Sequence, residues 1–315
     1  LVIEHTQKVI LLRPELAEAY NLIGLGFYEL GRLKDALLAF KKAVDINSVY
    51  SEAYNNLGNT FKALEDPKQA VECYEKAIII NPDYPSLHNN LGNAFIDLRR
   101  LDDALIAFKD ALIHNPDYHE SLNSLGVTLF KTGDHTEAIR VLKKAIKVKP
   151  DFVEAYLNLS EILKQTDQRD EAKECLRNAI QVNPDVADIH NNLGALFYAD
   201  EFFEESIKCF KKAIEIDPKL ADIYNNLGNA FKDIKLFEEA MKSYETAIEL
   251  EPNSAEIHNN FGSLLSENLS RHDDAIISFK KAISLDLYFY PAHLNLGHTF
   301  VALNQYESAV EAYKS

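Results

Sequence analysis

Apolar residues along the chain follow helical spacing, and the pattern returns in successive stretches of 34 residues. Each stretch contains two apolar stripes separated by a short polar segment. In residues 51–84 the first stripe, spaced i, i+3, i+4 and i+7, consists of Tyr54, Leu57, Gly58 and Phe61. The second stripe consists of Ala70, Tyr74 and Ala77. This spacing is typical of amphipathic α-helices and not of strands, so each stretch is predicted to form a pair of helices.

Proline and glycine mark the same period. The prolines that recur every 34 residues are Pro82, Pro116, Pro150, Pro184, Pro218 and Pro252. The glycines with this spacing are Gly24, Gly58, Gly92, Gly126, Gly194, Gly228 and Gly262, with Ser160 in the one remaining place. Proline ends the second helix of each pair, and the small residue lets the two helices approach closely. A fixed period of this length predicts an all-α solenoid of helical hairpins.

We number the repeat from Ala17 as position 1, which divides the chain into eight full units. The units are 17–50, 51–84, 85–118, 119–152, 153–186, 187–220, 221–254 and 255–289. The last unit has one extra residue, because Gly262 keeps its place whereas Ala275 arrives one position late. Insertions collect in loops, so we expect the extra residue near Asn268 to His272, in the turn between two helices.

The array is expected to be incomplete at both ends. Residues 1–16 fit the second helix of a preceding partial repeat, and residues 290–315 fit a partial ninth repeat. Terminal repeats of such arrays need a polar outer face, and these ends have apolar ones. We therefore expect the native chain to continue at both ends, or the ends to self-associate or meet other molecules.

The charge balance and the cysteines narrow the class of protein. The chain has 33 Lys and Arg against 49 Asp and Glu, a net charge of −16, which argues against a nucleic-acid partner because binding to phosphates needs positive charge. No apolar run approaches the ~20 residues of a bilayer span, so no membrane span is expected. All three cysteines fall at repeat position 23, a small-residue packing position. We expect free thiols in a reducing compartment, cytoplasmic or, in a eukaryote, nucleocytoplasmic.

The two stripes and the closing proline together resemble the signature of the tetratricopeptide repeat (TPR) family. Tyr or His occupies position 4, where that family often has Trp. The resemblance covers nearly the whole chain. It implies a right-handed α-α superhelix in which the first helices line the concave face and the second helices the convex face, and it implies no single function.

Histidine and cysteine form no pattern typical of a metal centre or a catalytic site. Position 4 is His in four units and Tyr in others, so these histidines are interpreted as packing residues: His88, His190, His258 and His293. The sequence contains neither HExxH nor CxxC, and its glycines do not follow a strand in the way a phosphate-binding loop requires. We expect no metal, no cofactor and no enzyme active site in this segment.

Acidic residues at position 2 have two interpretations. Seven of the eight full units have Glu or Asp there. Such residues suit the first turn of a helix, whose dipole favours negative charge. They could also open onto the groove and attract a basic partner. The acidic ridge considered for this role consists of Glu154, Asp188, Asp222 and Glu256.

The asparagines exceed what packing requires. Position 6 is Asn in seven of nine units, with Leu22 and Ser124 as the exceptions: Asn56, Asn90, Asn158, Asn192, Asn226, Asn260 and Asn295. Position 5 is also Asn in seven units: Asn21, Asn55, Asn89, Asn123, Asn191, Asn225 and Asn259. Position 9 adds Asn59, Asn93 and Asn229. Asn is a poor helix former, so the amides should gain hydrogen bonds, either between neighbouring helices or with the backbone of an extended peptide.

This row is similar to the superhelix of protein O-linked N-acetylglucosamine transferases, whose position-6 asparagines line the groove and hold substrate polypeptide. On that resemblance the seven position-6 asparagines form the groove set. The leading functional prediction is a non-catalytic scaffold that holds an extended polypeptide, with a preference for basic segments. The alternative is the substrate-recruiting arm of such a glycosyltransferase. A clamp for a C-terminal carboxylate is disfavoured, because positions 2, 5 and 6 have acids and asparagines in place of Lys or Arg.

Overall fold

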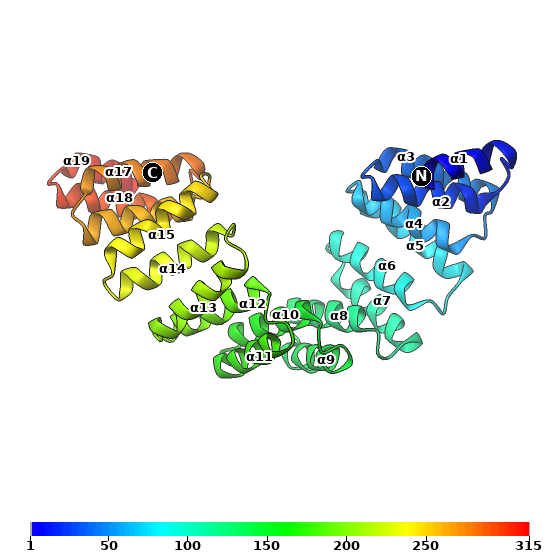
Figure 1. The fold of residues 1–315 in the computed structure, drawn as a ribbon, viewed down its shortest axis with the longest axis horizontal. Helices are drawn as coiled ribbons and strands as arrows, with labels where there is room; N and C mark the ends of the chain where they lie inside the picture. The colour runs from blue at the N-terminus through cyan, green and yellow to red at the C-terminus, as the bar shows by residue number, and fades with distance from the viewer. Residues whose placement is uncertain (1, 315) are drawn as a thin grey trace. The chain divides into compact units, whose positions relative to one another are not determined.

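The computed structural model describes residues 2–314 and is all-α. Within that range the chain forms nineteen α-helices and one π-helical turn, with no strand. After α1 (Val2–Leu12), the helices come in consecutive pairs, each with a first and a second helix (Figure 1). The all-α solenoid predicted from the period and the α-α superhelix implied by the resemblance are confirmed.

The bounds of the helices follow the repeat. The first helices are α2 (Ala17–Glu29), α4 (Ser51–Ala63), α6 (Pro85–Asp97), α8 (His119–Lys131), α10 (Val153–Gln165), α12 (Ala187–Ala199), α14 (Ala221–Asp233), α16 (Ala255–Ser263) and α18 (Tyr290–Ala302). The second helices are α3 (Leu33–Ile46), α5 (Pro67–Ile80), α7 (Leu101–His114), α9 (His135–Val148), α11 (Arg169–Val182), α13 (Phe203–Ile216), α15 (Phe237–Leu250), α17 (His272–Leu285) and α19 (Tyr306–Lys314).

The turn inside each pair contains one residue with a left-handed backbone. In two repeats it is glycine, Gly31 with φ 71° and Gly133 with φ 93°. In the others it is a residue with a Cβ, for which the left-handed conformation is sterically unfavourable: Glu65, Arg99, Asp167, Glu201, Lys235, Ser270 and Asn304. The left-handed residue reverses the chain so that the second helix packs back on the first.

The two helices of a pair approach where position 8 meets position 24. A Cβ built on Gly228 would lie 2.7 Å from the Tyr244 ring, which is fully buried. Six other glycines at position 8 meet a ring in the same way. The one repeat with Ser160 at position 8 has Leu176 in place of an aromatic residue at position 24. Glycine is therefore required wherever a ring fills the space between the helices.

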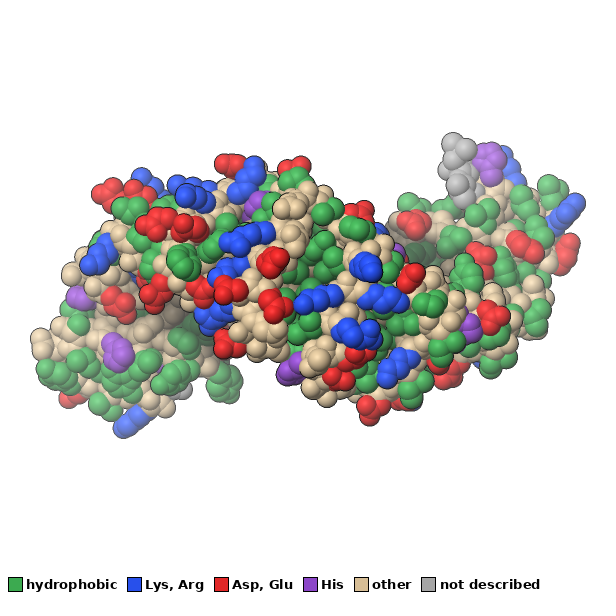
Figure 2. Space-filling model, turned by 90° about the horizontal axis from the view of Figure 1, so that it is seen from below, with side chains coloured by type: hydrophobic (Ala, Val, Ile, Leu, Met, Phe, Trp, Pro, Cys, Tyr) green, Lys and Arg blue, Asp and Glu red, His purple; other side chains and the backbone are tan. Residues whose placement is uncertain are grey.

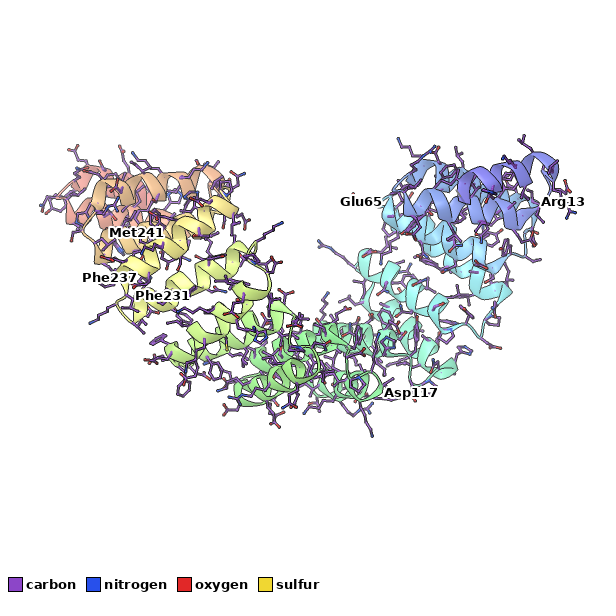
Figure 3. The ribbon with its side chains drawn as sticks, viewed as in Figure 1. Arg13, Glu65, Asp117, Phe231, Phe237 and Met241 are labelled. Carbon is purple, nitrogen blue, oxygen red and sulfur yellow. The ribbon has the colours of Figure 1, made fainter. Side chains whose placement is uncertain are left out.

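The chain forms two compact units, residues 1–162 and residues 163–315, which are described separately. In the second unit, one core cluster lies between the repeats 187–220 and 221–254 and contains Phe210, Phe231 and Tyr244. Phe237 and Met241 of α15 pack against its edge, near Phe231 of α14 (Figure 3). In the first unit the corresponding fully buried rings are Phe40, Tyr74 and Phe108.

Within each unit the first helices of successive repeats contact one another. In the first unit α2 touches α4, α4 touches α6 and α6 touches α8; in the second, α12 touches α14 and α14 touches α16. Within either unit, no pair of second helices makes contact of similar extent. Because the first helices lie closer together, their side is the inner side of the curve of each unit, as the resemblance implied.

The extra residue of the repeat 255–289 lies inside a helix. After α16, residues Leu264–Asn268 form a π-helical turn, in which the Leu269 N–H donates to the Leu264 carbonyl at 3.3 Å. The turn that follows occupies residues 269–271, as long as the turn 64–66 in a regular repeat. The prediction that the turn itself contains the insertion is wrong, because the helix absorbs one residue by widening its hydrogen-bonding pattern.

The surface carries charges of both signs. On the face shown in Figure 2, Lys and Arg side chains lie among Asp and Glu side chains. Several ion pairs join residues three apart at the start of a second helix, such as Arg32 with Asp35 and Arg271 with Asp274. No helix within residues 2–314 is long and apolar enough to cross a membrane.

Candidate functional site

The asparagines at positions 5 and 6 form hydrogen-bonded pairs between repeats. In each pair, Nδ2 of a position-6 Asn donates to Oδ1 of the position-5 Asn in the preceding repeat. The pairs are Asn56 with Asn21, Asn90 with Asn55 and Asn158 with Asn123 (all 2.9 Å), Asn226 with Asn191 (3.2 Å), and Asn260 with Asn225 and Asn295 with Asn259 (both 3.0 Å). Bonding between neighbouring helices is therefore one role of the amides.

Two repeats depart from this pairing for reasons visible in the sequence. The position-5 residue that precedes Asn192 is Leu157, which has no side-chain acceptor. At Ser124 the position-6 amide is missing, and Asn89 accepts a hydrogen bond from the Ser121 hydroxyl at 3.0 Å. Asn192 is thus a natural case of a position-6 amide without the inter-repeat bond.

The two rows differ in exposure. Most position-5 asparagines are buried, with Asn21 at 3% and Asn225 at 4% exposure, whereas every position-6 asparagine is half-buried. An amide has two donor hydrogens and two acceptor lone pairs, and the inter-repeat bond uses one hydrogen. Apart from a long 3.5 Å contact from Asn259 to Asn260, no position-6 oxygen accepts a side-chain hydrogen bond anywhere in residues 2–314. Each position-6 amide therefore retains an acceptor and a donor.

The position-9 asparagines bond within their own hairpin. The Tyr74 hydroxyl donates to Asn59 at 2.7 Å, and the Tyr244 hydroxyl donates to Asn229 at 2.6 Å. Burial is the main cause that raises the pKa of both tyrosines above the usual range, so the hydroxyls stay protonated. Asn93 has no such partner, since its repeat has Phe108 at position 24. The Nδ2 groups of Asn59 and Asn229 remain as donors.

The acidic ridge lies in the first turns of the first helices. Glu154, Asp188, Asp222 and Glu256 are all exposed. Glu154 also accepts a hydrogen bond from Nδ2 of Asn123 at 2.9 Å, so this acid belongs to the asparagine network. Glu52 accepts one from Asn21 at 3.2 Å in the same way. Position 2 thus serves the helix dipole and, in these two repeats, the inter-repeat contact.

The position-4 histidines each bond to a backbone carbonyl of the preceding repeat. Nε2 of His88, His190 and His258 lies 2.7–3.0 Å from the carbonyl oxygen of the proline six residues before it. His293 has a 3.2 Å contact to the carbonyl of Leu287, which occupies the proline position. In the described part of the chain, no group of three or more His, Cys, Asp or Glu is placed to hold a metal ion.

A partly buried ionic cluster in the second unit was not expected from the sequence. Nζ of Lys173 lies 2.8 Å from Asp200, and Nη1 of Arg169 lies 2.9 Å from the same carboxylate. Lys173 is also 2.7 Å from the exposed Asp170. Hydrogen bonds from Lys173 and then Arg169 lower the pKa of Asp200, and hydrogen bonds to Asp170 and Asp200 raise the pKa of Lys173. The signal was available, because position 21 is apolar in every other unit: Leu37, Val71, Leu105, Ile139, Ile207, Met241 and Ile276.

The three cysteines are free thiols, as expected. Cys73 and Cys175 are buried, and Cys209 is half-buried. Burial is the main cause that raises the pKa of Cys73 and of Cys209 to about 11. Thiols in this state are poor nucleophiles and poor metal ligands, in agreement with a packing role at position 23.

Sequence profiles described as tetratricopeptide repeat match most of the chain. Together the matches span residues 24–196, 203–277 and 290–315. One profile matches residues 51–84 and 221–254, the same ranges as two of the units read from the period. No curated protein sequence matches the chain.

Solved structures share the fold at low sequence identity. A chain in the crystal structure of the APC/C hetero-tetramer Cut9-Hcn1 matches with a TM-score of 0.60 at 15% identity over 91% of this chain. This chain spans 56% of the length of that one. The Pseudomonas aeruginosa pilF protein matches with a TM-score of 0.57 at 19% identity, over 71% of this chain and 99% of that chain. With its repeated helical pairs, its glycine-aromatic contacts and these profile matches, the chain belongs to the tetratricopeptide repeat family.

Proposed function

We propose that this chain is a non-catalytic scaffold that holds an extended polypeptide along its first-helix face. That face is the side of the first helices that carries positions 2, 6 and 9. The observation that supports the proposal most directly is the fixed position-6 row. Six of its amides are held by a bond to the preceding repeat, and each retains an acceptor and a donor.

The row suits a peptide backbone in chemistry and in spacing. A backbone offers one N–H and one C=O per residue, which are the complements of the amide groups. Helices pack ~8–10 Å apart, and three residues of an extended chain cover ~10 Å. Because the inter-repeat bond already orders the amide, binding costs less side-chain entropy.

The acidic ridge supports a preference for basic segments. Its four acids are exposed on the first-helix face and would attract Lys or Arg side chains at low ionic strength. The same acids would repel a carboxylate. We place such a scaffold in the cytoplasm or, in a eukaryote, in the nucleus as well, where the free thiols would persist.

A pair of asparagines tests the proposal because one has an inter-repeat bond and the other does not. The probe is a fluorescein-labelled twelve-residue peptide, (Lys-Gly-Gly)4, which offers backbone and positive charge with few side-chain contacts. We expect Asn192→Ala and Asn226→Ala each to weaken its binding about 2- to 12-fold, since one net hydrogen bond contributes ~0.5–1.5 kcal/mol. Stability should separate the two variants, because only Asn226→Ala loses a bond between repeats.

The matched control is Asn191→Leu, which removes the acceptor of Asn226 and copies the natural Leu157. It should lower the unfolding midpoint in urea and weaken peptide binding less than Asn226→Ala does, because the Asn226 amide is still present and only its ordering is lost. If both alanine variants bind the peptide as well as the unaltered chain does, the row has only its structural role. If binding falls only in proportion to stability, the proposal also fails.

The substrate-recruiting arm of an O-linked N-acetylglucosamine transferase would use the same row of amides. The long, nearly continuous row is the feature that favours this second candidate. The peptide experiment does not separate the two. The complete reading frame of the gene does, because this candidate requires a glycosyltransferase domain in the same polypeptide.

A further inference from the structure

A small pocket opens on the first-helix face of the second unit. It has a volume of about 40 Å³ and is lined by Ala195 and Tyr198 of α12, Phe210 of α13, and Asn226 and Asn229 of α14. Asn226 belongs to the position-6 row and Asn229 to position 9. A peptide held along the row would therefore pass this pocket.

The pocket exists where position 9 has a small side chain. Ala195 ends at its Cβ, whereas earlier units have larger residues at this position: Leu25, Asn59, Asn93, Val127 and Glu161. Below Ala195 the Phe210 ring, which is 1% exposed, supplies an apolar floor. In those five earlier units, a larger side chain would occupy the place that Ala195 leaves open.

Three of the residues that line the pocket have polar groups with defined hydrogen-bonding capacity. Oδ1 of Asn229 accepts from Tyr244, which leaves the Nδ2 hydrogens of Asn229 as donors. Nδ2 of Asn226 donates to Asn191, which leaves Oδ1 of Asn226 as an acceptor. The Tyr198 hydroxyl donates to Asp233 at 2.6 Å, so its oxygen can only accept. Burial and then this bond raise the pKa of Tyr198, so the hydroxyl keeps its proton.

Size and chemistry together restrict the side chain that fits. A water molecule needs ~10–15 Å³ of comparable volume, so about 40 Å³ accommodates about three non-hydrogen atoms. The donor on Asn229 and the acceptors on Asn226 and Tyr198 match a hydroxyl, which both accepts and donates. The apolar floor matches a methyl group. Valine has the size but leaves the polar groups unpaired, and leucine is too large.

We infer that this pocket is a subsite for a threonine side chain of the bound polypeptide. The inference rests on the proposed function, because it assumes a peptide along the position-6 row. The asparagine row would bind only the peptide backbone. The pocket between α12 and α14 would add recognition of one side chain and so make the scaffold selective for sequence at this point.

The test uses labelled peptides of the form (Lys-Gly-Xaa)4 with Gly, Thr, Val or Leu as Xaa, measured by fluorescence polarisation. A guest at every third residue recurs about once per repeat, so a sliding peptide can place one in the pocket. We expect the Thr peptide to bind about 2- to 12-fold more tightly than the isosteric Val peptide. In Ala195→Leu, which copies the natural Leu25, this preference should disappear, and the Gly peptide gives the reference affinity of the same variant.

Val127→Leu is the matched control, because it enlarges position 9 in the first unit and should leave the Thr preference intact. Thermal unfolding of both variants establishes that each is folded. If the Thr and Val peptides bind the unaltered chain equally well, the subsite is overturned. In that case, binding of the Gly peptide would still support the proposed function. Persistence of the Thr preference in Ala195→Leu also overturns the subsite. If no peptide binds, the proposed function fails and the subsite fails with it.

Discussion

The ionic cluster of Arg169, Lys173 and Asp200 can be exchanged for apolar residues that the chain already uses one repeat later. We consider the triple variant Arg169→Phe, Lys173→Ile and Asp200→Ile. The equivalent positions of the next interface hold Phe203, Ile207 and Ile234. Ile207 belongs to the buried core cluster there, and Ile234 packs against it, so the replacement recreates an interface that this backbone supports.

The expected change in stability follows from burial. The Lys173 side chain is 9% exposed and the Asp200 side chain 18%, so both side chains lose most of their contact with water on folding. Replacing a buried ion pair by packed apolar residues is commonly neutral or stabilising by ~1–4 kcal/mol. Arg169 is 45% exposed, so its ion pair with Asp200 contributes little to stability. We therefore expect the triple variant to gain about 1–2 kcal/mol at neutral pH.

The single variant Lys173→Ile should change stability in the opposite direction. It leaves Asp200 with Arg169 as its remaining cationic partner. Loss of one partner of a fully buried pair costs ~3–5 kcal/mol, and residual exposure and the Arg169 contact should reduce this to about 1–3 kcal/mol. The free energy of unfolding should therefore fall in the single variant and rise in the triple variant. The first change measures the cost of leaving Asp200 without Lys173, and the second measures the cost of burying the ion pair.

The pH dependence provides a second readout. The pKa of Asp200 is lowered in the folded chain, so its stabilisation is present above the usual carboxyl pKa, about pH 4, and is lost as the pH falls through the lowered folded value. The pKa of Lys173 is raised, so its contribution is lost as the pH rises above about 10.5. The advantage of the triple variant should therefore grow at both extremes.

Urea unfolding followed by circular dichroism, at about pH 7 and about pH 3, measures both effects. Because repeat arrays can unfold in stages, the midpoint of the second unit's transition is the quantity to compare. A triple variant that is less stable than the unaltered chain by 1 kcal/mol or more at neutral pH, with helix content preserved, would refute the reasoning. It would mean that the ionic cluster stabilises this interface more than apolar packing does.

Three further predictions concern the repeat itself. Gly228→Ser should lower the stability by about 1–3 kcal/mol, because its Cβ meets the Tyr244 ring. Gly126→Ser should cost clearly less, because it copies the natural pairing of Ser160 with Leu176, and equal midpoints of the two variants in thermal unfolding would contradict this. Deletion of Asn268 should restore a regular α-helix at a cost below about 1 kcal/mol, and a crystal structure that retains the π-turn would show that it has another cause. At pH 8, Cys73 should react with iodoacetamide roughly a hundredfold more slowly than an exposed thiol, since its pKa is about 11; comparison with the chain in urea supplies the reference.

Much of the fold could be predicted because its determinants are local and repeated. Pro82 and its equivalents end a helix, and Gly58 and its equivalents allow a close helix crossing, wherever they occur. The histidines at position 4 could be assigned to packing because tyrosine replaces them in other units. Their bond to a carbonyl of the preceding repeat could not be predicted, since it depends on the distance between two repeats.

The candidate site was predictable in composition and not in geometry. The sequence shows that Asn226 and Asn191 exist, but whether an amide faces its neighbour or a ligand depends on side-chain orientation. The insertion near Asn268 was misplaced for a related reason: the pattern locates an extra residue only between two recognisable positions, Gly262 and Ala275. The ionic cluster belongs to no catalytic motif, and its one signal in the sequence is the charge of Lys173 at a position that is apolar in the other units.

The π-turn at Leu264–Asn268 adds one residue to its repeat without shifting the contacts between that repeat and the next. Asn295 still pairs with Asn259 at 3.0 Å, although the two are 36 residues apart and the other pairs are 35 apart. The extra residue is thus accommodated within one helix, and the repeat positions after it still contact their usual partners. Chimaeras or grafted repeats that join this region to another array should therefore be aligned by hydrogen-bonded partners, because alignment by residue number would shift every contact after the turn by one side chain.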